Sequence, residues 1–160
     1  MPKYHTGILL IELEGEVTKV DVDDMMSVNT EDLTYEFSRQ ASLLAWTSTL
    51  TADAEAEWNA AKRELDETRA RIYHDVRMDM LTDGDKVTEA RIDAAVVQSS
   101  GYLDAAHKES MMKMQYRMLR GILDALDAKG SMLQSLGAHL RAELDQTGMV
   151  TRLKETLRNG

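Results

Sequence analysis

One apolar seam runs through the second half of the chain for more than four heptads, between residues 112 and 144. Its members follow one another at alternating steps of four and three: Met112, Tyr116, Leu119, Leu123, Leu126, Gly130, Leu133, Gly137, Leu140 and Leu144. The mean step of about 3.5 residues is the coiled-coil period, and a helix with this period packs against another helix along its length. The sequence therefore predicts a long helix over about residues 102–145 with a helical neighbour.

A second apolar stripe lies beside this seam on the same predicted helix. It consists of Met111, Met114, Met118, Ile122, Ala125, Met132 and Leu136. Methionine commonly fills irregular helical interfaces, so we interpret this stripe as core. One neighbouring helix cannot bury two faces, and we therefore expect a bundle that assembles from several copies of the chain. The residues predicted at the interface between copies are Leu119, Leu123, Leu126, Gly130, Leu133 and Leu140.

The first half of the chain predicts a β-hairpin followed by another long helix. Residues 6–22 are rich in branched apolar residues, and Gly15 stands where a turn is expected, which is typical of a hairpin. Residues 33–81 contain no Gly or Pro and carry apolar residues at helical spacing, which predicts a helix of about 50 residues. The Ser and Thr residues at 47–51 leave an alternative open, in which this helix is broken there.

Turn-forming residues divide the remainder of the chain. A turn at residues 82–85 is expected to end the first long helix, and a short helix around Ile92 follows it. Residues 99–101 interrupt the helical pattern before the seam helix begins. Residues 146–148 are expected to close that helix, so that a separate short helix forms over residues 150–157.

The expected fold class is all-α. We predict a long antiparallel helical hairpin or bundle with a small N-terminal β-hairpin, assembling into an oligomer. The expected parts are an N-terminal hairpin arm at residues 1–26, a helical core at 27–148 and a short C-terminal helix at 149–160.

The composition excludes several classes of protein. The chain has no cysteine, which rules out disulfides and thiolate metal sites. No stretch approaches the roughly 18 apolar residues of a membrane span, so no contact with a membrane is expected. Glu12 breaks the apolar run at residues 8–11, so this run does not predict a signal peptide. We expect a cytoplasmic protein, or one of the host-cell cytoplasm if a phage encodes it.

The sequence contains no pattern typical of an enzyme. No glycine-rich phosphate loop is found, and Leu81 occupies a ligand position in the one segment that resembles a calcium loop. Asp104 and His107 are a single pair, whereas a carboxylate-bridged di-metal bundle needs two Glu-x-x-His pairs and two further Glu. We therefore expect no catalytic residue, no metal and no cofactor, and an enzyme with a metal site in the bundle is only a remote alternative.

The net charge of −9 is spread unevenly along the chain. Residues 1–60 carry three basic and twelve acidic side chains, whereas residues 111–160 carry eight basic and five acidic ones. Charges are screened over about 8 Å at physiological salt, so a local basic patch can still bind a polyanion.

Two groups of basic residues have aromatic neighbours. The first is the segment Arg69-Ala70-Arg71-Ile72-Tyr73-His74, with Lys62 and Arg63 before it and Arg77 after it. The second consists of Lys113, Arg117 and Arg120 beside Tyr116, with Lys108 upstream. Cations in a row with aromatic rings are typical of proteins that bind single-stranded nucleic acid. The alternative is an ordinary solvated helix face, on which nearby acidic residues pair with these cations.

Three segments follow one another in a recognisable order. The first long helix contains Leu33, Tyr35, Glu36 and Trp46, and later Arg69-Ala70-Arg71-Ile72-Tyr73; the second contains Gly121-Ile122-Leu123-Asp124-Ala125-Leu126-Asp127-Ala128-Lys129-Gly130. Over about residues 28–145 this order resembles the phage recombination mediator proteins of the UvsY type, in which a Lys-Ala-Arg-Leu-x-Tyr-Tyr motif precedes a second long helix.

The resemblance implies a non-enzymatic, ring-forming accessory protein of DNA recombination and repair. Such a protein binds single-stranded DNA and helps to load a recombinase in place of single-strand-binding protein. The residues expected to contact DNA are Arg69 and Arg71, with Lys62, Arg63, Tyr73, Lys113, Arg117 and Arg120 as further candidates. The alternative is an oligomeric helical scaffold, for example a virion-associated protein, that does not bind nucleic acid.

Overall fold

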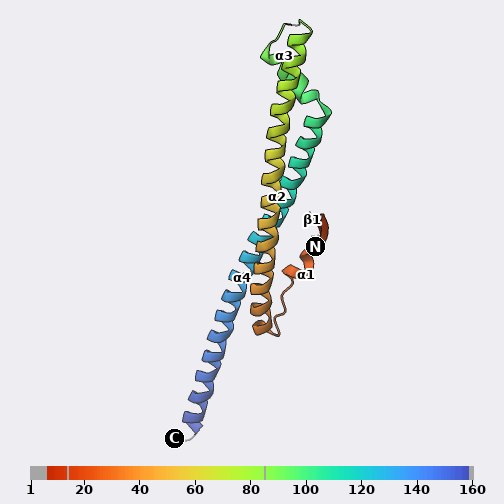
Figure 1. The fold of residues 1–160 in the computed structure, drawn as a ribbon. Coiled ribbons are helices and arrows are strands. Elements are labelled where there is room, and N and C mark those ends of the chain that lie inside the picture. Colours follow the sequence, from red (N-terminus) through yellow and green to blue (C-terminus); the bar gives the residue numbers. More distant parts are fainter. Residues whose placement is uncertain (1–6, 14, 85, 159–160) are drawn as a thin grey trace. The chain divides into compact units, whose positions relative to one another are not determined.

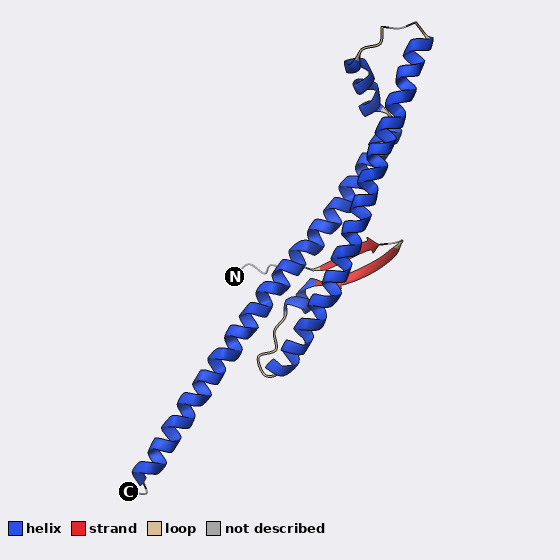
Figure 2. Cartoon of the chain, turned by 60° about the vertical axis from the view of Figure 1, so that its left-hand side comes forward, coloured by secondary structure: helices blue, strands red, loops and turns tan. Residues whose placement is uncertain are grey.

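The computed structural model describes residues 7–13, 15–84 and 86–158, with side chains as far as residue 148. The predicted hairpin is confirmed as a two-stranded sheet of β1 (Ile8–Leu13) and β2 (Glu16–Asp21), which are red in Figure 2. Gly15 between the strands has a φ of 80°, a conformation that glycine adopts at little cost. A short helix that was not predicted, α1 (Val22–Met26), follows directly.

Long helices make up the rest of the chain (Figure 1), which confirms the predicted all-α hairpin with a small β-hairpin. The elements are α2 (Leu33–Thr82), α3 (Glu89–Gln98) and α4 (Ser100–Arg158). The side chain of Asp32 caps α2 by accepting a hydrogen bond of 2.9 Å from the backbone N–H of Tyr35. Helix α2 is unbroken at residues 47–51, so the alternative of a break there is wrong.

Helix α4 is longer than predicted. It continues through Gln146–Gly148, where we expected an end, and runs without interruption to Arg158. The separate short helix predicted within residues 149–160 is therefore wrong, and residues 159–160 lie outside the described part. The physical reason is that an interior glycine costs a helix only about 1 kcal/mol, and no proline is present to remove a backbone donor.

The contacts divide the chain into two compact units. The first unit comprises residues 1–9, 20–47 and 122–160, and the second comprises residues 10–19 and 48–121. Leu126 and Leu133 are fully buried in the first unit, and Ile92 and Leu119 are fully buried in the second. Each unit therefore has its own apolar core.

The apolar seam is covered mainly by the chain's own α2. In the first unit, a Cβ atom added to Gly130 would lie 3.5 Å from the side-chain nitrogen of Gln40, and one added to Gly137 would lie 3.5 Å from the ring of Phe37. The small residues of the seam thus allow α2 and α4 to approach closely.

This arrangement corrects the predicted interface between copies. Leu119, Leu126 and Leu133 have no exposed surface in a single chain, so the structure assigns them to the core and not to a surface for a second copy. Leu123 is half-buried, and Leu140 is 37% exposed. One helical neighbour from the same chain satisfies the coiled-coil period, and the period alone does not reveal whether that neighbour is intramolecular.

The methionine stripe is also placed differently from the prediction. Met111, Met114, Met118 and Met132 are between 37% and 51% exposed, so they do not belong to the core of a single chain. Ile122 is the buried member of the stripe. Helix α2 covers the seam face of α4 and leaves the neighbouring face, which carries the methionines, exposed in a single chain.

A buried ion pair in the first unit fixes the connection between α1 and α2. The Lys129 ammonium lies 3.3 Å from a carboxylate oxygen of Glu36, and these side chains are 4% and 1% exposed. Lys129 also donates hydrogen bonds of 3.0 Å to the carbonyl of Met25 and 2.7 Å to that of Ser27. The same ammonium thus neutralises a buried carboxylate and holds the chain that leads into α2.

Opposing effects act on the pKa of Glu36. Burial is the largest single effect and raises the pKa. The hydrogen bond from the backbone N–H of Asn29, the ion pair with Lys129 and the charge of Arg39 each lower the pKa, and together they outweigh burial. The net pKa lies below the ordinary value, so Glu36 is a carboxylate at neutral pH.

Among the helices of the described residues, none combines the length and the apolar character that a membrane crossing requires.

Candidate nucleic-acid interface

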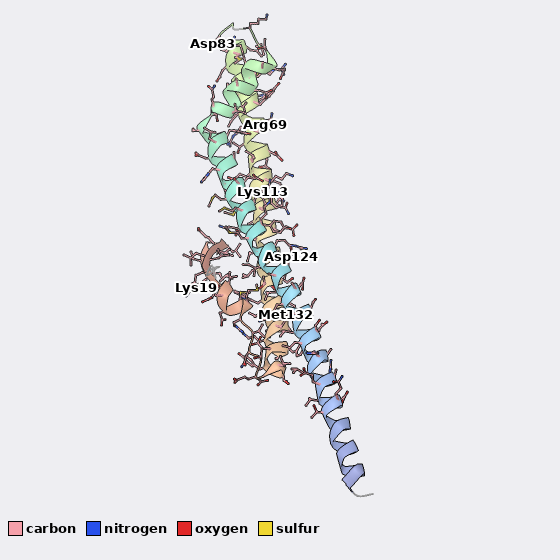
Figure 3. The ribbon with its side chains drawn as sticks, turned by 180° about the vertical axis from the view of Figure 1, so that it is seen from behind. Lys19, Arg69, Asp83, Lys113, Asp124 and Met132 are labelled. Atoms are coloured by element: carbon pink, nitrogen blue, oxygen red, sulfur yellow. The ribbon has the colours of Figure 1, made fainter. Side chains whose placement is uncertain are left out.

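The first basic group lies on α2 within the second unit, where Figure 3 labels Arg69. Residues four, seven and eleven apart lie on one face of a helix, so Lys62, Arg69 and Tyr73 share a face. Arg71 is two residues from Arg69 and therefore lies about 200° around the helix from it. Arg69 and Arg71, the two residues predicted to contact DNA, therefore lie on different faces of α2.

Arg63 also lies apart from this face. It is rotated by about 100° from Lys62, its neighbour in sequence. Lys62, Arg63 and Arg71 are all exposed, and within the part of the chain described here none of them forms an ion pair. Lys62 is thus an open cation on the face of Arg69, whereas Arg63 and Arg71 lie on other faces of α2.

Two members of the Arg69 face contact α3. A guanidinium nitrogen of Arg69 lies 3.5 Å from a carboxylate oxygen of Asp93, and the Tyr73 hydroxyl donates a hydrogen bond to Glu89. The hydrogen bond to Glu89, with some burial and the negative charge of Glu89, raises the pKa of Tyr73. The phenol therefore stays protonated. The alternative of a solvated helix face predicted that acidic residues pair with this group. Two acidic partners do exist, but they come from α3 and not from α2.

The second basic group lies on α4, where Lys113, Arg117 and Arg120 follow at helical spacing as predicted. Lys113 and Arg117 line a shallow depression of about 340 Å³ together with Ser110, Met114 and Met118. The Lys113 ammonium lies 5.6 Å from the centre of the Trp58 ring, within the range of a cation–π contact, and 4.0 Å from Glu109. Arg120 is exposed on the same helix.

Trp58 is a member of the site that the sequence-based prediction missed. Its ring stacks on Tyr116 of α4, with the ring centres 5.4 Å apart and the planes at 21°, and its indole N–H donates a 2.6 Å hydrogen bond to Glu109. Its position four residues before Lys62 was the available signal, because that spacing puts both on one face.

The cations and aromatic rings that share this face of α2, with their neighbours on α4, are called the basic-aromatic stripe here. It consists of Trp58, Lys62, Arg69 and Tyr73 on α2 with Lys113 and Tyr116 on α4. From Trp58 to Tyr73 it extends about 22 Å along the helix axis, at 1.5 Å per residue. The stripe combines cations with aromatic residues, which are the two kinds of side chain that proteins use to bind a single nucleic-acid strand.

A separate cavity of about 290 Å³ in the second unit has the opposite character. Glu12, Glu57 and Glu64 line it, and its one cation, Lys108, lies 2.6 Å from Glu64. Such a surface repels phosphate. In the residues that the structure describes, no group of three or more His, Cys, Asp and Glu side chains is arranged to hold a metal ion.

Comparison with protein-family models, curated proteins and solved structures finds no match for this chain. The basic-aromatic stripe is the surface in the described part of the chain whose chemistry is most selective for a class of ligand.

Proposed function

We propose that this chain is a non-enzymatic accessory protein of DNA recombination and repair, and that it binds single-stranded DNA along the basic-aromatic stripe. The observation that carries the proposal is the shared face of Trp58, Lys62, Arg69 and Tyr73, with Lys113 beside it. Cations along the stripe neutralise phosphates, and aromatic faces stack with unpaired bases, which a duplex does not offer.

The proposed role within recombination comes from the resemblance to phage mediator proteins. The order of the Arg69–Tyr73 segment and the Gly121–Gly130 segment on two long helices supports it. In this role the protein would load a recombinase in place of single-strand-binding protein. The proposal requires no catalytic group and no cofactor.

Assembly of several copies, with a ring as the proposed form, belongs to the same proposal. Exposed methionines on α4 support it, because a row of large apolar side chains is costly to leave in water. Repetition of the stripe in each copy would add many weak phosphate contacts on one strand and raise the overall affinity.

The assembly proposal predicts that charge on the methionine stripe reduces the mass of the particle. Met114→Glu with Met118→Glu is expected to shift the mass measured by light scattering toward that of one 18.0 kDa chain. The control is Ser131→Glu with Ser135→Glu, which places the same two charges on exposed positions of α4. An equal fall in mass for both variants, or a wild-type protein that already has the mass of one chain, would contradict this use of the stripe.

The DNA-binding proposal predicts different results for two arginines that are two residues apart. Arg69→Ala should weaken binding of a single-stranded oligonucleotide about five-fold or more at 50 mM salt and reduce the salt slope, because it removes one phosphate contact. Arg71→Ala removes the same charge from another face, and we expect a change of less than about two-fold. Fluorescence anisotropy measures both, and equal losses would show that the stripe is not the binding surface.

A helical scaffold without nucleic-acid binding is the second candidate function. The observation that favours it is the acidic balance of the chain, together with the exposed methionines that suit protein partners. A protein that forms a stable oligomer but does not bind oligonucleotide at 50 mM salt would be assigned to this class.

A further inference from the structure

Helix α3 places two carboxylates directly on two members of the basic-aromatic stripe. Asp93 pairs with Arg69, and Glu89 accepts the hydrogen bond of Tyr73. Glu89 and Asp93 are four residues apart on α3, and Arg69 and Tyr73 are four residues apart on α2. One face of α3 therefore matches one face of α2 over about one helical turn. The two groups that we propose to meet DNA therefore already hold negatively charged partners from the same chain.

Apolar residues, and not these carboxylates, hold α3 in place. Ile92 has no exposed surface and Val96 is 1% exposed, whereas Glu89 and Asp93 are exposed residues at the edge of the contact with α2. Burial of such side chains stabilises the packed helix by far more than an exposed ion pair does. Loss of the two carboxylate contacts is therefore compatible with a docked α3.

The carboxylate contacts are of the kind that a phosphate can replace. Arg69 and Asp93 are 58% and 55% exposed, and a pair in this setting is only weakly stabilising because water screens it. A phosphate oxygen accepts hydrogen bonds from a guanidinium or a phenol just as a carboxylate oxygen does. A DNA strand that makes several contacts along the stripe can thus replace both carboxylates with its phosphates at little cost in free energy.

We propose that α3 is an acidic cover of the DNA-binding surface, in which Glu89 and Asp93 occupy Tyr73 and Arg69 until the phosphates of a single strand displace them. This inference rests on the proposed function, since it names a regulation of the same stripe. It accounts for the presence of α3 acids at a surface that binds an anion. It also makes binding selective for long strands, because an isolated phosphate offers too few contacts to displace both carboxylates.

The test is a pair of charge-matched variants titrated with a labelled single-stranded oligonucleotide at 50 mM salt. Glu89→Gln with Asp93→Asn removes the two negative charges of the cover and keeps the shape of both side chains. Glu67→Gln with Asp79→Asn removes the same two charges from exposed positions of α2 that lie off the stripe. Circular dichroism and thermal unfolding confirm that both variants keep the fold of the wild-type protein.

The cover variant is expected to bind about five- to twenty-fold more tightly than wild type, since each exposed contact that is released contributes up to about five-fold. We expect the control to change affinity by less than about two-fold. Arg69→Ala added to the cover variant should abolish the part of the gain that comes from Asp93→Asn, because Arg69 and Asp93 act through one contact.

Three outcomes would overturn the inference. Equal gains for the cover and control variants would mean that net charge alone limits binding. Binding of wild type that the cover variant does not improve would reject the acidic cover and leave the proposed function intact. Failure of wild type and both variants to bind would reject the proposed function, and the cover with it.

Discussion

Lys129→Met is expected to lower the free energy of unfolding by about 3 kcal/mol or more. The substitution leaves the Glu36 carboxylate buried without its closest counter-charge, and the carbonyls of Met25 and Ser27 lose their donor. The methionine fills most of the volume of the lysine stem, so the loss is electrostatic and not a cavity effect. Urea unfolding followed by circular dichroism measures the change.

Lys108→Met is a matched control for this prediction. Lys108 lies on the same helix and pairs with Glu64 at 2.6 Å, but the two side chains are 55% and 53% exposed. We expect a loss of less than about 1 kcal/mol, because an exposed ion pair contributes little. Adding Glu36→Gln to Lys129→Met should restore part of the stability, since no buried charge then remains unpaired. A double variant as unstable as Lys129→Met would attribute the loss to the carbonyl contacts instead.

The same carboxylate predicts a pH dependence. The pKa of Glu36 is lowered from its ordinary value of 4.5, so its contribution to stability is fully present above that value and is lost as the pH falls through the folded-state pKa. The free energy of unfolding of wild type should therefore fall more steeply below pH 4.5 than that of Glu36→Gln. Parallel curves for the two proteins would show that Glu36 does not titrate differently in the folded and unfolded chain.

A steep salt dependence of DNA binding is the other large expected effect. Each phosphate contact on a single strand contributes about 0.7 to the slope of log affinity against log salt concentration. Three contacts, from Lys62, Arg69 and Lys113, would reduce the affinity about 20-fold between 50 and 200 mM salt. An oligomer that engages one strand with several stripes would show a still larger decrease. The acidic remainder of the chain does not cancel this effect, since it is screened over about 8 Å.

The periodic parts of the fold could be predicted from the sequence. The absence of Gly and Pro from residues 33–81 gave α2, and the seam gave α4 and its need for a neighbour. The hairpin followed from branched residues on either side of Gly15. These features depend on local conformation and on a one-dimensional pattern, which a single sequence contains in full.

The partners of each face could not be predicted in the same way. Leu126 at the seam and Met118 beside it are both apolar, but only the arrangement of α2 decides that one is buried and the other exposed. Likewise, the Asp93–Arg69 contact joins residues 24 apart and needs the packed position of α3. Glu36 and Lys129 were visible only as charges on apolar helix faces, 93 residues apart in the sequence, and their pairing required the fold.

Part of the candidate site was, in contrast, available from the sequence. The rotation of about 100° per residue already separates Arg69 from Arg71 and places Trp58 on the face of Lys62. Treating the Arg69–Tyr73 segment as one motif concealed this difference. For a binding surface on a long helix, the helical phase of each cation is therefore more informative than its nearness in sequence.

The most direct test of DNA binding is fluorescence anisotropy of a labelled single-stranded oligonucleotide, titrated with the full chain at 50 and 200 mM salt. A duplex of the same length serves as the control. The account predicts tight binding of the single strand at the lower salt, a loss of about 20-fold or more at the higher salt, and weaker binding of the duplex, whose bases are not free to stack. No binding at either salt, or equal binding of single strand and duplex, would contradict it.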